Sequence, residues 1–483
     1  MTTLSSSDRV AVIGGGPAGI VVAKELVEAG FEPVVLEQSG GLGGQWDHGS
    51  PHSAIWPGMR TNTSGAMTRF GERPVPRSWP MFPRAEDVRC ELVRYAEQFG
   101  VAGRVRLGTR VLSARQAAGG WDVETQDVVD GSVACERFAA VVACSGRFAA
   151  PQLPAALADA FADRVEVLHA ADYRGREPFA GRRVLVLGNS ISGVEIAADL
   201  GMDASTTVVS ACRRPRWIIP KLARGVPADQ QWFTALADLV GRTLGPEAVA
   251  AGLLAALEAA VGDPALVGGL TPDPDLLATG LSQAQHYLPL VAEGRIEVRP
   301  AIASVDGDVV RFVDGSAHAV DAVILATGYE ASLPYVDIDL DDLVLQTFDP
   351  ARPGLAVMGQ YVLHGPYLPV LELQARWIAA VWSGSSDLSA APPLPQLPFF
   401  VHHMLAGAFA AAVGAAPDPA AHPQVADALL FGPMLPERYR LDDPAAAARF
   451  ASAVAGFTAP PEHVALLAAL PTGDPRAPAA AAA

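Results

Sequence analysis

The sequence contains two glycine-rich turns whose spacing suits the pyrophosphate of a dinucleotide. The first, Gly14–Gly19, reads G-x-G-x-x-G and lies between an apolar segment and a helical pattern. Gly14 permits a tight turn, Gly16 leaves room for a phosphate against the backbone, and Gly19 allows close packing of helix on strand. The helix N-terminus adds free N–H groups and a partial positive charge. The residues predicted to bind this first nucleotide are Gly14, Gly16, Pro17, Ala18, Gly19, Glu37 and Gln38.

The charge that follows the second strand of each unit distinguishes the two nucleotides. Glu37 suits a free ribose diol, as in FAD. After the second turn, Gly188–Gly193, the matching position holds Arg213 and Arg214, which suit the 2′-phosphate of NADP. Ser190 replaces the middle glycine, so the backbone approach there is less close, and a solvated arginine loop is the alternative interpretation. The residues predicted to bind the second nucleotide are Gly188, Ser190, Ser192, Gly193, Arg213 and Arg214.

Each turn requires a β-α-β unit to position it. Around the first turn, hydrophobic periodicity predicts strands at 8–13 and 33–37 and a helix at 17–29. The second unit has predicted strands at 184–187 and 206–210 and a helix at 194–200. Further predicted elements are a helix at 84–99, a strand at 138–144, strands within 295–329, a helix at 366–382, and Ala-rich helices up to about residue 470.

The pattern predicts an α/β fold with two dinucleotide-binding, Rossmann-like domains and Ala-rich helical additions. The NADP domain is predicted to be inserted into the FAD domain. An Ala/Leu-rich helical insert is expected at 221–292, and a proline-rich linker at 392–398. The predicted boundaries are 1–175 for the first part of the FAD domain, 176–317 for the NADP domain, 318–470 for the second FAD part with the C-terminal helices, and 471–483 for a disordered tail.

Composition narrows the class of protein. The 483 residues carry 35 basic and 52 acidic side chains, a net charge of −17, which argues against nucleic acid and anionic membranes as partners. Four irregularly spaced cysteines predict mostly buried thiols in a reducing compartment. We see no secretory signal and no uncharged apolar stretch of about 18 residues, so we expect a cytoplasmic protein without a membrane span. A homodimer is compatible with the sequence.

The joint set of motifs resembles the class B flavoprotein monooxygenases over about residues 8–384. The pattern is most similar to that of the flavin-containing monooxygenases, whose siblings are the Baeyer–Villiger monooxygenases. One linker fingerprint is only half present, since His169 and Tyr173 match it whereas Asp163 and Val165 do not. The motifs are Gly14–Gly19, Gly43-Gly44-Gln45-Trp46, Thr61-Asn62, Phe82-Pro83, Gly188–Gly193, Arg213-Arg214-Pro215, Ala326-Thr327-Gly328-Tyr329 and Glu372–Trp377.

The resemblance implies an FAD- and NADPH-dependent enzyme that inserts one oxygen atom from O2 into a small organic substrate. The oxygen would be transferred from a flavin carbon-4a (hydro)peroxide, most simply to nitrogen or sulfur. Asn62 would be the catalytic residue, because its amide would lie beside the flavin and can donate and accept hydrogen bonds without changing charge. The helix after Pro366 would point its N-terminus at the flavin. Further cofactor contacts implied by the motifs are Gly44, Gln45, Trp46, Thr61, Asn62, Thr327 and Gly328.

Several alternatives remain open from the sequence. Baeyer–Villiger oxidation of a ketone would use the same cofactors. An NADPH oxidase or reductase flavoprotein would share both nucleotide sites, and so would a non-enzymatic flavin-binding protein. A disulfide reductase is disfavoured because the chain has no C-x-x-C pair. The substrate itself carries no motif.

Overall fold

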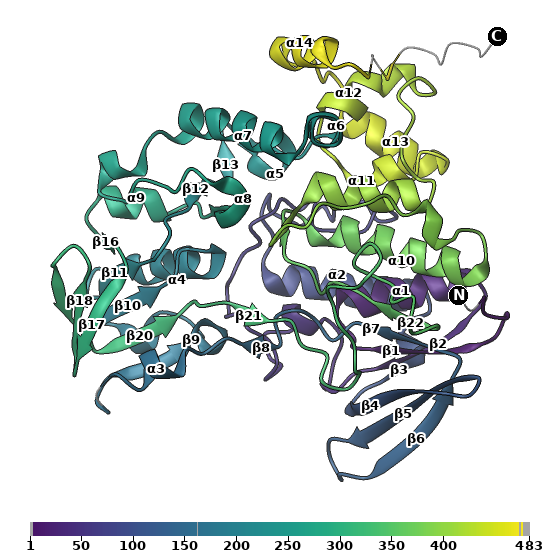
Figure 1. The fold of residues 1–483 in the computed structure, drawn as a ribbon, viewed down its shortest axis with the longest axis horizontal. Coiled ribbons are helices and arrows are strands. Elements are labelled where there is room, and N and C mark those ends of the chain that lie inside the picture. Colours follow the sequence, from purple (N-terminus) through teal and green to yellow (C-terminus); the bar gives the residue numbers. More distant parts are fainter. Residues whose placement is uncertain (1–2, 162, 473–474, 477–483) are drawn as a thin grey trace.

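The computed structural model describes residues 3–161, 163–472 and 475–476. Two parallel five-stranded sheets form its framework, one on each side of Figure 1. The first has the order β22-β7-β1-β2-β3. Its strands are β1 (Arg9–Ile13), β2 (Glu32–Leu36), β3 (Val105–Arg106), β7 (Ala140–Ala143) and β22 (Leu355–Val357).

Helices cover one face of this first sheet. Helix α1 (Pro17–Glu28) begins with a proline at its first position, where the missing N–H costs nothing, and it is almost wholly buried. It packs against α10 (Tyr367–Ser383), and α2 (Ala85–Gln98) lies alongside it (Figure 1). The other face carries an antiparallel sheet of β4 (Thr109–Ala117), β5 (Gly120–Asp127) and β6 (Val133–Phe138). The predicted opening β-α-β unit is therefore confirmed.

The second sheet has the order β16-β11-β10-β20-β9. Helix α4 (Ile191–Gly201) joins β10 to β11, as predicted. The sheet extends beyond both ends of the predicted domain 176–317, because β9 and β20 belong to it. Both lie within the predicted FAD domain, because sequence periodicity shows a strand but not the sheet that the strand joins. The strands are β9 (Glu166–His169), β10 (Arg183–Leu187), β11 (Thr207–Ala211), β16 (Ile296–Arg299) and β20 (Ala322–Leu325).

Two chain crossings connect the sheets. There β8 (Ala150–Pro151) pairs antiparallel with β21 (Tyr329–Glu330) (Figure 1). A small antiparallel sheet of β17 (Ile302–Asp306), β18 (Val309–Phe312) and β19 (Ala317–Ala319) packs on the second domain. A short helix, α3 (Ala155–Ala158), follows β8.

The insert at 221–292 is only partly helical, which corrects the prediction. Its strand β15 pairs with β12 (Trp217–Ile219), which ties the insert to the second domain by sheet as well as helix, and β13 pairs with β14 within the insert. Helix α6 reaches the C-terminal helices α11 (His402–Ala412) and α12 (Ala426–Phe431) (Figure 1). The elements are β13 (Leu222–Ala223), β14 (Val226–Pro227), α5 (Ala228–Gln231), α6 (Ala235–Leu244), α7 (Pro246–Val261), η5 (Pro264–Val267), α8 (Leu276–Thr279), β15 (Leu281–Gln283) and α9 (Tyr287–Ala292).

One segment of the insert contradicts the expectation that the chain has no stretch long and apolar enough to span a membrane. By length and composition, Pro246–Val267 is long and apolar enough to cross a membrane even though it contains Glu247 and Glu258, and 11% of its most apolar window is buried. The cysteine prediction also needs correction. Cys144 and Cys212 are buried, whereas Cys90 and Cys135 are exposed, and all four are free thiols.

The C-terminal region stacks on α10 at the top of Figure 1. Residues 392–398 have no regular structure, as predicted. Of the predicted disordered tail 471–483, residues 473–474 and 477–483 lie outside the described residues, and Arg476 forms an ion pair with Asp427 at 2.7 Å. The elements are β23 (Leu363–His364), β24 (Phe400–Val401), α11 (His402–Ala412), α12 (Ala426–Phe431), η8 (Pro436–Tyr439), α13 (Pro444–Ala453) and α14 (Pro461–Ala469).

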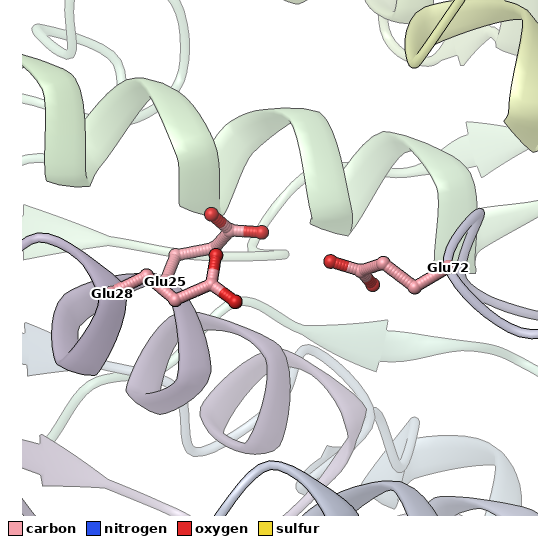
Figure 2. Close-up of side chains that lie close together, drawn as sticks. All are labelled: Glu25, Glu28 and Glu72. Atoms are coloured by element: carbon pink, nitrogen blue, oxygen red, sulfur yellow. The ribbon is translucent and has the colours of Figure 1, made fainter. Parts of the chain in front are cut away.

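A buried charge network fastens this region to α1. Figure 2 shows Glu25 and Glu28 projecting from one helix toward Glu72 on a facing segment. The carboxylates are already paired, since Lys24 contacts all three and Arg440 contacts Glu25 at 3.1 Å and Glu72 at 2.7 Å. The cluster therefore acts as a structural ion-pair network rather than as a set of free metal ligands.

Candidate functional site

Four loops meet at the carboxyl edge of the first sheet. They follow the parallel strands β1, β2, β7 and β22, so their first residues lie side by side. In doubly wound sheets, ligands bind at this edge where the strand order reverses, here between β1 and β7. The edge brings together Gly14–Gly19, Glu37, Ser145–Arg147 and Met358–Gln360.

The three glycines of the first turn have the predicted geometry. Gly14 has φ +114°, and a Cβ there would lie 2.5 Å from the carbonyl oxygen of Cys144. A Cβ on Gly19 would lie 1.9 Å from the Gly14 oxygen, so only glycine allows helix and turn to touch. A Cβ on Gly16 would meet only the Gly44 Cα, at 3.6 Å. No other protein atom lies within 4 Å of that Cβ position, and α1 begins directly after it at Pro17 and Ala18, where its N-terminal N–H groups suit a phosphate.

Glu37 is held in place at the end of β2. Its side chain is buried, with Oε2 accepting the Gly15 N–H at 2.5 Å and Oε1 accepting the Ser39 N–H at 2.7 Å. Each carboxylate oxygen can accept a further hydrogen bond, so the orientation fits a ribose diol. Gln38 lies next to it and is partly buried.

The second glycine cluster folds back over the first turn. In η1 (Gly44–Trp46), a Cβ on Gly44 would lie 2.8 Å from the Gly16 Cα, so the two backbones face each other without side chains between them. The Gln45 amide is occupied locally, since its Oε1 accepts the Ala54 N–H at 2.9 Å and its Nε2 donates to the His52 oxygen at 3.1 Å. Trp46 packs against the core. Gln45 and Trp46 therefore shape this loop.

The Thr61-Asn62 loop presents an unpartnered polar atom. Thr61 is buried, with its N–H donating to the Pro83 oxygen at 3.0 Å and its hydroxyl to the Thr63 oxygen at 2.7 Å. The Oδ1 atom of Asn62 is buried and has no hydrogen-bond partner among the described residues. A buried acceptor without a donor is costly, so this atom fits a donor supplied by a bound molecule.

The insert contacts the Thr61-Asn62 loop through Asp229. Asp229 of α5 accepts the backbone N–H of Ser64 at 2.6 Å and its hydroxyl at 3.0 Å. The carboxyl group is buried, which raises its pKa to about 6, and its Oδ1 has no partner among the described residues. The loop that carries Asn62 is therefore clamped by an element of the second domain.

Sequence reasoning missed two residues at the carboxyl edge. Gln360 follows β22, its side chain is buried, and neither of its amide atoms has a partner in the described part of the chain. Arg147 follows β7, and its Nη1 is likewise buried and unpartnered. The available signal was a polar residue after an apolar run, as at Met358-Gly359-Gln360. With the open Gly16 turn and Glu37, these groups fit a flavin dinucleotide.

The second turn repeats the geometry of the first. Gly188 has φ +115°, with a Cβ position 2.5 Å from the Ala326 oxygen, and a Cβ on Gly193 would lie 1.9 Å from the Gly188 oxygen. Ser190 is the N-cap of α4, and Ser192 is exposed on its first turn. The hydroxyl of Ser190 accepts from Nη1 of Arg216 at 3.3 Å, a contact that sequence reasoning missed.

The two predicted phosphate-binding arginines differ in their surroundings. Both follow β11 and are exposed. Arg214 is held by the insert, through Asp273 at 2.8 Å and Asp275 at 3.9 Å. Arg213 has no ion pair within the described chain, so it keeps its full charge available for a phosphate.

Thr327 and Gly328 lie where the chain leaves the second sheet. The Thr327 hydroxyl donates to the Gln152 oxygen at 2.5 Å, and the Gly328 oxygen accepts from Nε2 of His169 at 3.0 Å. Nδ1 of His169 accepts the Ala171 N–H at 3.0 Å. Both ring nitrogens of His169 are thus used within the linker, and burial lowers the pKa of the ring, so this histidine is structural.

Comparison with known proteins gives a consistent match. The family described as flavin-binding monooxygenase-like matches residues 7–395. Flavin-containing monooxygenase 5 of Oryctolagus cuniculus is 29% identical over 402 residues, covering 79% of this chain and 74% of that protein. The N-oxide-forming dimethylaniline monooxygenase 2 of Pan troglodytes is 26% identical over 401 residues, with the same two coverages of 79% and 74%.

Solved structures agree in fold. A mutant cyclohexanone monooxygenase from Rhodococcus sp. Phi1, bound to NADP+, superposes with a TM-score of 0.58 at 19% identity, covering 79% of this chain and 86% of that chain. A flavin-containing monooxygenase from Stenotrophomonas maltophilia gives a TM-score of 0.57 at 20% identity, covering 79% and 99%. At these identities the likeness concerns the arrangement of two nucleotide domains.

Proposed function

Because the chain belongs to the flavin-binding monooxygenase-like family, and is therefore an NADPH-dependent flavoprotein monooxygenase that uses FAD, we propose that it oxygenates nitrogen or sulfur in a small organic substrate. The observation that carries this proposal is the buried, unpartnered Oδ1 of Asn62. A relative whose name specifies N-oxide formation supports the same direction.

We assign the FAD site to the carboxyl edge of the first sheet. Bound FAD, once reduced by NADPH, supplies the activation of O2. The open backbone at Gly16 would accept the pyrophosphate, the Glu37 carboxylate would orient the ribose, and Gln360 would offer its free amide. Arg147 would add positive charge next to the same edge.

Asn62 is the residue that we propose to be catalytic. Its amide can accept a hydrogen bond through Oδ1 and donate through Nδ2 without gaining charge. A fixed neutral donor of this kind stabilises developing negative charge without reorganising. The Ser64–Asp229 contact keeps the loop in one position. Asn62 would thereby make oxygen transfer to the substrate faster than the release of hydrogen peroxide.

The NADP(H) site is assigned to the second turn. Gly188 and Gly193 would position the pyrophosphate, and Ser190 would donate its hydroxyl while its oxygen faces Arg216. Arg213, which has no ion pair within the described residues, is the cation that we expect to pair with the 2′-phosphate.

A coupled screen tests the proposal. Purified enzyme would be offered amines, thioethers and ketones, with NADPH consumption, product and hydrogen peroxide measured in each reaction. We expect product in near-stoichiometric ratio to NADPH for at least one amine or thioether, and Asn62→Ala should divert that NADPH to hydrogen peroxide. Lactone or ester formation from ketones alone would contradict heteroatom oxygenation, and peroxide alone with every substrate would favour an oxidase.

A further inference from the structure

A cavity of about 370 Å³ lies between the insert and the C-terminal region. Its walls come from α6, α7 and α8 on one side and from α11 and residues 392–399 on the other. This volume is within the range of pockets that hold small organic ligands. The proline-rich segment 392–398, which the sequence indicated only as a linker, therefore forms part of a built wall.

The cavity adjoins the boundary between the two nucleotide domains. Its inner wall includes His364, which directly precedes Gly365 and Pro366 at the start of α10. A Cβ on Gly280 of the insert would lie 2.6 Å from Cε1 of His364, so the His364 ring lies directly against the Gly280 backbone. The Arg216 charge, beside the second glycine turn, also acts on His364. The cavity thus reaches the contact between the insert and the segment that leads into α10.

The walls of the cavity are almost entirely apolar. Leucines, valines, alanines and prolines dominate, together with Phe399 and Met404. The described lining residues that can carry charge are two histidines and one ion pair, Asp238 with Arg242 at 2.8 Å. Burial lowers the pKa of His364 to about 4 and that of His403 to about 3, so both rings are neutral at physiological pH.

We propose that this cavity is the substrate pocket and that it takes a neutral, apolar thioether in preference to a basic amine. The inference rests on the proposed heteroatom oxygenation and narrows its substrate class. A protonated amine entering the cavity would lose its hydration and find only a carboxylate that is already paired with arginine. A thioether carries no charge, and its alkyl groups gain from burial against the apolar walls.

Binding without NADPH tests the pocket separately from the reaction. We would titrate methyl alkyl sulfides of increasing chain length, and N,N-dimethylalkylamines of the same lengths, into the FAD-loaded enzyme by calorimetry at neutral pH. Each added CH2 of the sulfides should tighten Kd by about three- to fourfold until the cavity is full. The amines should bind at least about tenfold more weakly than sulfides of equal length.

Two neighbouring alanines of α7 supply matched variants. Ala250 lines the cavity, whereas Ala251 is exposed on the same helix. Ala250→Trp should weaken sulfide binding at least about tenfold, and Ala251→Trp should leave it unchanged. Equal effects of the two variants, or amines that bind as tightly as sulfides, would overturn the proposal.

Product analysis then tests the proposed pocket and the proposed reaction separately. A sulfide that binds, loses affinity in Ala250→Trp and becomes a sulfoxide with NADPH supports both the pocket and the reaction. A sulfide that binds in the same way but is recovered unchanged, while NADPH is still consumed, supports the cavity as a binding site and refutes sulfur oxygenation.

Discussion

Replacing Gly16 by valine should remove FAD from a protein that remains folded. The Cβ of the new side chain would have its nearest protein neighbour, the Gly44 Cα, at 3.6 Å, which is ordinary van der Waals contact. Gly16 also has φ −77°, which valine adopts without strain. The side chain would instead occupy the space in front of the α1 N-terminus, where we expect the pyrophosphate.

The size of the effect follows from ligand linkage. A ligand present at about one hundred times its Kd raises the free energy of unfolding by about 2.7 kcal/mol. Gly16→Val should lose this gain, while its stability without FAD should stay near that of the wild type. Gly14→Val is the contrasting variant, because φ +114° and a Cβ 2.5 Å from the Cys144 oxygen should destabilise the fold itself.

The assay combines thermal unfolding, with and without added FAD, and the visible absorbance of the purified protein. Wild type should be yellow and gain Tm with FAD, and Gly16→Val should be colourless with a Tm that FAD does not change. A yellow Gly16→Val protein with a normal FAD response would refute the placement of the pyrophosphate at this turn.

Three further predictions follow from the site. Asn62→Ala should still oxidise NADPH but release hydrogen peroxide in place of product, and peroxide titration against product would check this; unchanged coupling would make Asn62 structural. Arg213→Ala should reduce the preference for NADPH over NADH by about tenfold or more, and Arg214→Ala by less because Asp273 already holds that side chain, as measured by kcat/KM for both nucleotides. Burial raises the pKa of Asp229 to about 6 in the folded chain, so the folded state binds this proton more tightly than the unfolded state does. The free energy of unfolding should therefore be higher at low pH and should fall by about 3 kcal/mol in all as pH rises from about 4 through 6. Asp229→Asn should flatten this part of the stability curve in urea unfolding at several pH values, and an unchanged slope would contradict the assignment.

The parts of the fold that are local in sequence could be predicted well. Gly14 and Gly19 fix a turn through their own backbone and the adjacent helix, so their spacing alone indicates it. The parallel pairing of β20 with β10 depends on residues more than one hundred positions apart, and a buried apolar run is compatible with either sheet. The domain boundary therefore could not be read from the pattern, although the strand itself could.

The same distinction applies to the site. Glu37 could be predicted because it directly follows a strand next to the turn. Gln360 and Arg147 reach that edge only through the order of strands β22-β7-β1, which no local motif encodes. Arg216 was missed because three arginines occur close together, and only the folded chain shows which one contacts Ser190.

The insert illustrates why cofactor use is easier to predict than substrate choice. Phosphate and ribose recognition require glycines and charges at fixed spacings, so sequence records them. The cavity requires only apolar side chains at the right places on α6, α7, α8 and α11, and many residue types satisfy that requirement. Yet the same insert supplies Asp229 beneath the loop of Asn62. We therefore expect substrate binding and the position of the proposed catalytic amide to be linked through a segment whose sequence shows no motif. Changes in the packing of α5 and α6 should then affect coupling as well as specificity.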